Sequence, residues 1–254
     1  NRDGVLPIQA MHRYSKTKVD AVSVMLANNE TGMIQPVAQL QTVFGDSVYI
    51  HTDAAQAVGK IPVDVQTLGV DALTIAAHKL YAPKGIGALY LRNPGLLQPI
   101  MQGGGQEYGR RAGTENTPYI VAFGAAAQLA HDTMEIESLR LTRLRDQLLH
   151  QLKLEFPAAS QNGTVHGCLP NTLSVRFPGC SGQRLLDVCP QIAASTGSAC
   201  HDGNNTASPV LLAMDIPNYE ALGTIRLSIG RNTTEKHILT AAMALGAAAR
   251  ETTE

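Results

Sequence analysis

Two residues in the first half of the chain have the chemistry to act together: an acid and an amine, each of which follows a predicted buried strand. The apolar run Val48–Ile50 leads to Asp53, and the run Ala72–Ile75 leads to Lys79. Short apolar runs with β-branched residues are typical of buried strands. Because ligands bind beyond the carboxyl ends of strands in parallel α/β sheets, we expect both side chains to face one crevice. An Asp that keeps a pyridinium nitrogen protonated and a Lys that forms a Schiff base are the two groups that pyridoxal phosphate (PLP) needs. A buried Asp–Lys ion pair is the structural alternative.

The segments around these two residues predict the elements that position them. An apolar run at 21–27 ends in Asn28, Asn29 and Glu30, and apolar residues at helical spacing follow at 36–44. The alternation of strand, helix and strand predicts a right-handed parallel α/β sheet, with a further strand at 87–91. Asn29, Asp53 and Lys79 would then follow three consecutive strands, which favours a ligand site. Polar residues end strands in any case, because loops are polar.

The second half predicts a long helix followed by a smaller α+β domain. Leu141, Leu144, Leu148 and Leu152 form one stripe of the helix expected at 118–154, and such a stripe is typical of core packing. We expect a domain boundary near Ala130, which gives a large domain at 1–130 and a small domain at 131–254. The small domain is expected to contain strands at 172–177 and 224–229, a helix at 183–188, and a last helix capped at Asn232 or Thr233.

Composition excludes several classes of partner. The chain has 254 residues and a net charge of −1 without a basic run, so we expect neither nucleic acid nor an anionic membrane as a partner. No apolar stretch reaches the ~18 residues that a membrane span needs. The four cysteines show no CxxC spacing, so we expect no metal site. Reduced thiols in the cytoplasm are the simplest interpretation of these cysteines.

Six motifs in order resemble the class V aminotransferase-type PLP enzymes, and more narrowly the cysteine desulfurases and selenocysteine lyases. The resemblance runs from about Val19 onward and implies a fold-type-I PLP-dependent transferase, with a partial parallel-sheet large domain followed by a smaller α+β domain. The motifs are Ala27-Asn28-Asn29-Glu30-Thr31-Gly32, His51-Thr52-Asp53-Ala54-Ala55-Gln56, His78-Lys79-Leu80-Tyr81-Ala82-Pro83-Lys84-Gly85-Ile86-Gly87, Arg111-Ala112-Gly113-Thr114-Glu115-Asn116, Gly197-Ser198-Ala199-Cys200 and Ile225-Arg226-Leu227-Ser228-Ile229-Gly230-Arg231.

The resemblance implies a cofactor role for five residues. Lys79 matches the lysine that forms the Schiff base, and Asp53 matches the partner of the pyridine nitrogen. Gln56 and Asn29 match side chains that bond the phenolic oxygen of the cofactor, and His78 matches a phosphate contact. An ionised Asp53 would keep the ring nitrogen protonated, and Lys79 would move protons as a general base and acid.

The resemblance also implies roles in the substrate reaction and in assembly. Thr114 matches a threonine that reaches the phosphate of a neighbouring subunit, which implies a homodimer. Arg226 matches the arginine that binds the substrate carboxylate, for which a planar guanidinium is suited. Cys200 matches the nucleophile that takes sulfur from the substrate and carries it as a persulfide. The remaining cysteines, Cys168, Cys180 and Cys189, carry no motif and are expected to be structural.

Two departures from the family pattern qualify these expectations. Ala76-Ala77 stands where relatives commonly place a hydroxyl that helps to hold the phosphate. The chain also lacks the family's first third, which supplies a Gly-rich phosphate turn and a side chain that stacks on the ring. We therefore expect a fragment with an incomplete cofactor cup.

The expected function is cysteine desulfurase activity: L-cysteine becomes L-alanine and its sulfur passes to Cys200. A sulfur or selenium acceptor protein is a further expected partner. A selenocysteine lyase that acts on L-selenocysteine is one alternative. A catalytically incompetent fragment, or a dimerisation module, is the alternative from another class.

Overall fold

A computed structural model describes residues 1–15, 17–197 and 207–253 of the chain. Residue contacts divide the chain into two compact units: unit 1 contains Asn1–Pro7, Ala27–Pro36 and Met134–Glu254, and unit 2 contains Ile8–Leu26 and Val37–Thr133. Unit 1 therefore draws on both ends of the sequence. The predicted division at Ala130 stays a prediction.

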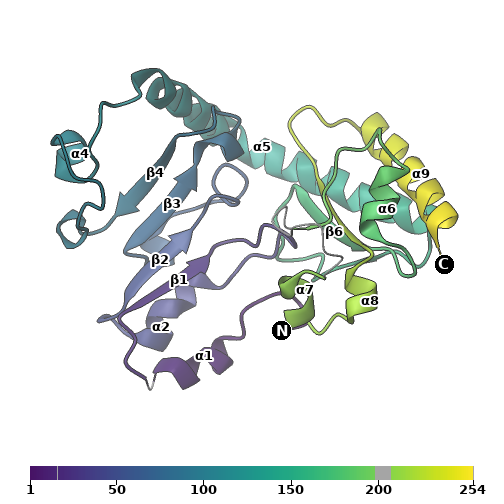
Figure 1. Ribbon diagram of the computed structural model, residues 1–254, viewed down its shortest axis with the longest axis horizontal. Helices are drawn as coiled ribbons and strands as arrows, with labels where there is room; N and C mark the ends of the chain where they lie inside the picture. Colours follow the sequence, from purple (N-terminus) through teal and green to yellow (C-terminus); the bar gives the residue numbers. More distant parts are fainter. Residues whose placement is uncertain (16, 198–206, 254) are drawn as a thin grey trace. The chain divides into compact units, whose positions relative to one another are not determined.

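Unit 2 is built on a four-stranded sheet, as Figure 1 shows. Strands β1 (Ala21–Met25), β2 (Tyr49–Asp53) and β3 (Ala72–Ala76) are parallel, in the order in which they occur in the chain. The prediction of an α/β sheet is confirmed, with one correction. Strand β4 (Gly87–Leu91) pairs antiparallel with β3. Its connection, residues 77–86, is shorter than the about a dozen or more residues that a parallel crossover needs.

Short helices precede, connect and follow the strands of unit 2. The predicted helix at 36–44 is a 3₁₀ turn, η1, that continues into α2. The first helix, α1 (Ile8–Ser15), was not predicted; it is short, and none of its residues is buried. These short helices are α1 (Ile8–Ser15), η1 (Val37–Gln39), α2 (Leu40–Phe44), α3 (Val65–Leu68), η2 (Ala77–Leu80), η3 (Pro94–Leu96) and α4 (Gln106–Gly109).

Unit 1 is built on a three-stranded antiparallel sheet covered by helices. Its strands are β5 (Ser160–Gln161), β6 (Thr172–Arg176) and β7 (Thr224–Ser228), in that order. The predicted cap of the last helix is wrong by one residue: Thr234 accepts a hydrogen bond from the backbone N–H of His237 and begins the helix. The helices are α5 (Thr117–Glu155), which unit 1 shares from Met134 onward, α6 (Gly182–Asp187), α7 (Pro209–Ala213), α8 (Asn218–Ala221) and α9 (Glu235–Thr252).

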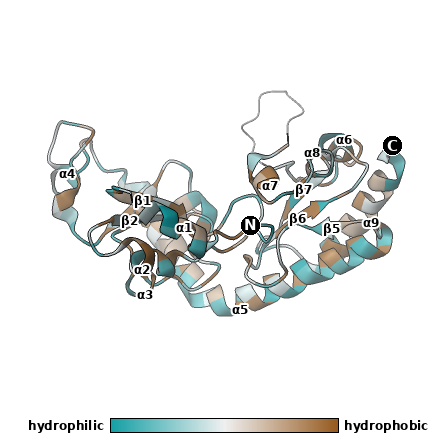
Figure 2. Cartoon of the chain, turned by 90° about the horizontal axis from the view of Figure 1, so that it is seen from below, coloured by the Kyte–Doolittle hydropathy of each residue, from teal (hydrophilic) through white to brown (hydrophobic). Residues whose placement is uncertain are grey.

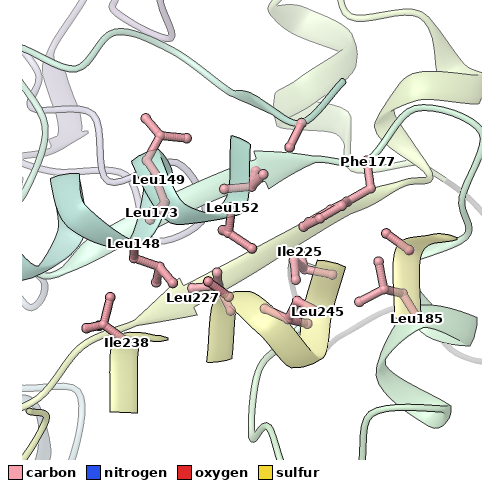
Figure 3. Close-up of a cluster of buried hydrophobic side chains, with 14 of the residues drawn as sticks. Leu148, Leu149, Leu152, Leu173, Phe177, Leu185, Ile225, Leu227, Ile238 and Leu245 are labelled. Carbon is pink, nitrogen blue, oxygen red and sulfur yellow. The ribbon is translucent and has the colours of Figure 1, made fainter. Parts of the chain in front are cut away.

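The predicted leucine stripe of α5 forms part of the core of unit 1. Leu141, Leu144, Leu148 and Leu152 are all buried, and they belong to a cluster with side chains of β6, β7, α6 and α9 (Figure 3). Both α5 and α9 carry hydrophilic as well as hydrophobic residues along their length (Figure 2), as helices with one buried face do. This packing fixes β7, the strand that carries Arg226.

The cysteines predicted to be structural are buried in unit 1 and form no disulfide. Burial raises the pKa of the Cys168 and Cys189 thiols, although the Arg145 guanidinium opposes the effect at Cys168. Nη1 of Arg145 lies 3.0 Å from Sγ of Cys168. Raised pKa values keep these thiols protonated and unreactive, which suits a packing role.

Residues 1–15, 17–197 and 207–253 contain neither a membrane-spanning helix nor a cluster of metal ligands. Within these ranges no helix is both long and apolar enough to cross a membrane. The same ranges contain no cluster of three or more His, Cys, Asp or Glu residues that could hold a metal ion.

Candidate functional site

Asp53 lies at the carboxyl end of β2 in unit 2, and its backbone and side chain are both fixed. Its carbonyl oxygen accepts a hydrogen bond of 2.8 Å from the Leu26 amide. Its Oδ1 accepts one of 2.8 Å from the amide of Ala55, two residues on. The side chain is nevertheless exposed. Asp53 therefore presents an exposed carboxylate of fixed orientation to a ligand at the carboxyl end of β2.

Gln56 and Lys60 lie in the tight turns that follow Asp53. Nζ of Lys60 donates a hydrogen bond of 2.8 Å to the carbonyl oxygen of Gln56, which ties the two turns together. Burial, together with the positive charge of Lys79, lowers the pKa of Lys60 to about 8. Sequence reasoning gave Lys60 no role, because a single Lys in a turn carries no signal of burial.

His78 and Lys79 lie in η2, directly after β3. Ala77 and Leu80 of this helix are buried, whereas His78 and Lys79 are exposed. The helix ends at Tyr81, which adopts a left-handed φ of 67°, an uncommon conformation for a residue other than glycine. The buried residues Ala77 and Leu80 anchor this helix. His78 and Lys79, the two predicted cofactor contacts, therefore point away from the core.

The register of the sheet brings the predicted acid and amine to one edge. Strands β2 and β3 are parallel neighbours, and Asp53 is aligned with Thr74, so both strands end at the same edge of the sheet. Lys79 follows β3 by three residues. The charge of Lys79 also acts on Lys60, which lies in the turns after Asp53. The polar residues after β2 and those after β3 therefore gather together in unit 2.

Thr114 also belongs to unit 2 and is exposed. It lies between α4 and α5, in a segment where Gly103, Gly109 and Gly113 all adopt positive φ. Glycine adopts such angles without steric cost, so these residues permit the irregular path of the segment. The role of Thr114 at a neighbouring subunit stays a prediction.

Asn29 and Arg226 belong to unit 1, and the structure brings them into contact. Nη1 of Arg226 donates a hydrogen bond of 2.7 Å to the backbone carbonyl oxygen of Asn29. Nε of Arg226 is buried without a hydrogen-bond partner in the described part of the chain. A buried N–H without a partner costs stability unless a ligand satisfies it. The arrangement thus leaves Nε of Arg226 as an unused donor among the described residues.

The turn that contains Asn29 is rigid. The side-chain oxygen of Asn28 accepts hydrogen bonds of 2.9 Å from the amides of Glu30 and Thr31. The amide of Gly32 closes the turn on the carbonyl oxygen of Asn28, also at 2.9 Å.

Cys200 lies outside the described residues, so its predicted role stays a prediction; Gly197 and Ala207 are the described residues on either side of it.

The comparisons with known proteins define the family. Residues 1–240 match the aminotransferase class-V family, and the chain belongs to that family. Members of this family, including the NifS and IscS cysteine desulfurases, depend on PLP.

Among individual relatives, the chain is 44% identical over 223 residues to cysteine desulfurase NifS of Azotobacter vinelandii, which covers 87% of this chain and 56% of the relative. It is 40% identical over 245 residues to cysteine desulfurase IscS of Ehrlichia chaffeensis, which covers 95% of this chain and 60% of the relative. A solved structure described as a NifS-like protein matches with a TM-score of 0.88 and 31% identity, over 97% of this chain and 65% of that chain. The chain thus spans less than two thirds of the length of these relatives.

The residues of unit 2 fit PLP. The exposed carboxylate of Asp53 can accept a hydrogen bond from a ring N–H, because the Ala55 amide uses its Oδ1 and leaves Oδ2 without a hydrogen bond from the described residues of unit 2. The exposed amine of Lys79 can bond the aldehyde carbon of the cofactor. These are the acid and the amine that the sequence singled out.

Proposed function

We propose that the protein is a PLP-dependent cysteine desulfurase that converts L-cysteine to L-alanine in the cytoplasm. The observation that carries the proposal is the placement of Asp53 and of Lys79 after adjacent parallel strands that end at one edge of the sheet. Membership of the aminotransferase class-V family, and similarity to cysteine desulfurases, support the choice of reaction.

Four side chains of unit 2 would bind and orient the cofactor. The bound cofactor supplies an electron sink for the substrate. Asp53 would hold the proton on its ring nitrogen, and Gln56 would donate to its phenolic oxygen. His78 would contact its phosphate. Lys79 would bind it covalently and, once released by the incoming substrate amine, would carry protons to and from the substrate carbons as a general base and acid.

Arg226 and Cys200 would act on the substrate. Arg226 would bind the substrate carboxylate through the donors that Asn29 leaves free. The thiolate of Cys200 would attack the substrate sulfur. The new S–S bond forms as the C–S bond breaks, the electron pair of that bond passes to the substrate carbon, and a proton completes alanine. The products are alanine and a persulfide on Cys200.

A homodimer is part of the proposal, because Thr114 matches a residue that reaches a neighbouring subunit and is exposed here. An acceptor protein would then take the sulfur from Cys200. Asn29 would contribute its side chain to the phenolic oxygen of the cofactor, while its backbone holds Arg226.

The test replaces Cys200 with Ala and uses the PLP-loaded protein, purified from the cells that produce it. A thiol is a poor leaving group at neutral pH, because its pKa is about 8.5. A nucleophile must therefore attack the substrate sulfur to remove it. Cys200→Ala should nearly abolish alanine release from cysteine, while release from selenocysteine should survive in larger part. The absorbance of the cofactor should not change. Cys189→Ala, which removes a buried thiol outside the motifs, is the matched control.

The same measurement separates the alternatives. Intact turnover of cysteine by Cys200→Ala would refute the role of this thiol. Turnover of selenocysteine alone by the unsubstituted protein would favour a selenocysteine lyase. A protein that binds no PLP and releases no alanine from either substrate would favour a catalytically incompetent fragment or a dimerisation module.

A further inference from the structure

The sheet of unit 1 has one apolar face and one polar face. Leu173 of β6 and Ile225 and Leu227 of β7 belong to the hydrophobic core (Figure 3). Because successive side chains of a strand point to opposite faces, the residues that alternate with them lie on the other face. These residues are all polar: Thr172, Ser174 and Arg176 in β6, and Thr224, Arg226 and Ser228 in β7.

Much of this polar face is buried. Ser174 is 1% exposed and Thr224 is 3% exposed, and so is Asn162, which directly follows β5, at 1%. The polar face of an antiparallel sheet ordinarily meets water. Burying a polar side chain is unfavourable unless it is hydrogen-bonded. The hydrogen bonds of these three side chains therefore decide what they do.

Asn162 ties β6 and β7 together on this face. Its Nδ2 donates hydrogen bonds to Oγ of Ser174 at 2.9 Å and to Oγ1 of Thr224 at 3.3 Å. Its backbone amide also donates to the carbonyl oxygen of Ser174 at 2.9 Å. One amide side chain thus fixes two hydroxyls that belong to two different strands.

Both of these hydroxyls belong to neighbours of Arg226. Ser174 lies directly opposite Arg226 in the antiparallel pair of β6 and β7, where opposed Cβ atoms are about 4.5–5.5 Å apart. Thr224 precedes Arg226 by two residues on the same face of β7. On its other side, Arg226 pairs with Ser195 through two backbone hydrogen bonds of 3.3 and 2.6 Å. The residues on both sides of the arginine are therefore held.

This face also carries unused hydrogen-bonding capacity. Among the described residues, two buried side-chain atoms lack a hydrogen-bond partner, and they are Oδ1 of Asn162 and Nε of Arg226. One is an acceptor and the other is a donor. A buried polar atom without a partner costs stability, so a face built for stability alone would hold apolar side chains. The polar network thus points to a role in the use of Arg226.

We infer that Asn162 is a positioning residue for Arg226. By fixing the hydroxyls of Ser174 and Thr224, it holds the arginine in the orientation that binds the substrate carboxylate. The inference rests on the proposed function of Arg226. The bond to the carbonyl oxygen of Asn29 holds the tip of this side chain, and the Asn162 network holds its base. A planar guanidinium forms two parallel bonds to a carboxylate only in the correct orientation.

The test compares the binding of L-alanine, the proposed product, with that of alaninamide, which lacks the carboxylate. Both are titrated into the PLP-loaded protein and followed by the absorbance of the cofactor. Asn162→Leu removes the amide but keeps a side chain of similar size, and Ser174→Ala and Thr224→Val each remove one of its acceptors. Thr172→Val is the matched control, because Thr172 is buried on the same face but its hydroxyl bonds Asn171.

Asn162→Leu should weaken the binding of alanine by about 10-fold, because the misoriented guanidinium loses bonds to the carboxylate. Its binding of alaninamide should match that of Thr172→Val. Ser174→Ala and Thr224→Val should show smaller losses of the same kind, and in a protein that carries both, Asn162→Leu should add little. Equal losses for alanine and alaninamide, or no loss in any variant, would overturn the inference. If Asn162→Leu does not fold, the two hydroxyl variants decide by the same criterion.

A second measurement separates this inference from the proposed function. The Nε–H signal of Arg226 in a proton–nitrogen correlation spectrum, identified by its loss in Arg226→Lys, reports the surroundings of this group without any ligand. Asn162→Leu should shift this signal and Thr172→Val should not, and an unchanged signal in Asn162→Leu would overturn the inference. Equal binding of alanine and alaninamide by the unsubstituted protein would instead contradict the carboxylate role of Arg226, and the Nε–H signal would still decide the role of Asn162.

Discussion

The guanidinium of Arg226 donates a hydrogen bond from Nη1 to the backbone carbonyl oxygen of Asn29 at 2.7 Å, across 197 residues of sequence. This bond joins two motifs that sequence reasoning treated separately. It orients the guanidinium plane and occupies one nitrogen, while Nε stays buried and without a partner among the described residues. A substrate carboxylate bound on the unused side would therefore meet an arginine that is already held in place.

Arg226→Lys should raise the KM for cysteine by about 10- to 100-fold, because a lysine keeps the charge but loses the planar pair of donors and cannot reproduce the bond to Asn29 in the same geometry. Arg250→Lys is the control, since Arg250 is exposed and also donates to a backbone carbonyl, that of Glu155. Steady-state kinetics of alanine release would check the prediction. Equal KM values for the two variants would contradict the role of Arg226.

Lys79 should be the residue that carries PLP. Borohydride reduction of the yellow protein, followed by peptide mapping, should place the cofactor on Lys79. Lys60 is the relevant competitor, because a pKa of about 8 leaves part of its amine neutral and nucleophilic near neutral pH. Lys79→Ala should lose the label and Lys60→Met should keep it. A label on Lys60 or Lys84 in the unsubstituted protein would refute the assignment.

Lys60 should also make stability depend on pH. Burial and Lys79 lower its pKa to about 8 in the folded state, whereas the unfolded chain keeps the usual value. Between pH 8 and the usual value near 10.4 the unfolded state binds more protons, so stability should rise with pH through this window. Below it, the folded state bears the full cost of the buried charge.

Lys60→Met removes this cost of about 3 kcal/mol and also the bond to Gln56, worth about 1 kcal/mol. The variant should therefore be more stable than the unsubstituted chain by about 2 kcal/mol at pH 7, and the advantage should shrink above pH 8. Urea unfolding at several pH values would measure it. An advantage that does not change with pH would show that the ammonium of Lys60 bears no such cost.

The parts of this fold that were predictable are those encoded by local patterns. The parallel strands β1 to β3 and the buried stripe of Leu141, Leu144, Leu148 and Leu152 follow from apolar periodicity alone. The antiparallel direction of β4 follows from the short connection between β3 and β4. The alternation of predicted strands and helices does not by itself give this direction. Helix α1 has only 8 residues, fewer than the window of about 11–18 residues in which helical periodicity is recognised.

In the candidate site, too, local sequence patterns predicted some residues and missed others. Asp53 and Lys79 were found because each follows a strand, whereas contacts between distant segments left no local signal. Arg145 illustrates the point: it lies outside the leucine stripe of α5, yet it is 4% exposed and donates to the carbonyl oxygen of Leu169. Glu30 lies inside a recognised motif, but the hydrogen bond that it accepts from Ser208 left no local signal, because Ser208 is far away in the sequence.

Gly59 packs directly beneath the helix that carries Lys79, which yields the last prediction. It adopts a φ of +73°, and a Cβ there would lie 2.4 Å from Cδ2 of Leu80 and 3.0 Å from Cβ of Ala130. Leu80 is buried and follows Lys79 in η2. Gly59→Ala should therefore displace Leu80 and, with it, the amine of Lys79.

Gly69→Ala separates this contact from backbone strain. Gly69 has a similar φ of +66°, but a Cβ there would meet only the side chain of the exposed Gln41, which can turn away. We expect Gly69→Ala to cost about 1 kcal/mol for the left-handed backbone alone. Gly59→Ala should cost about 2–4 kcal/mol, because overpacking is added, and it should also weaken PLP loading. Urea unfolding and PLP titration would measure both effects, and equal losses in the two variants would show that Leu80 does not set the position of Lys79.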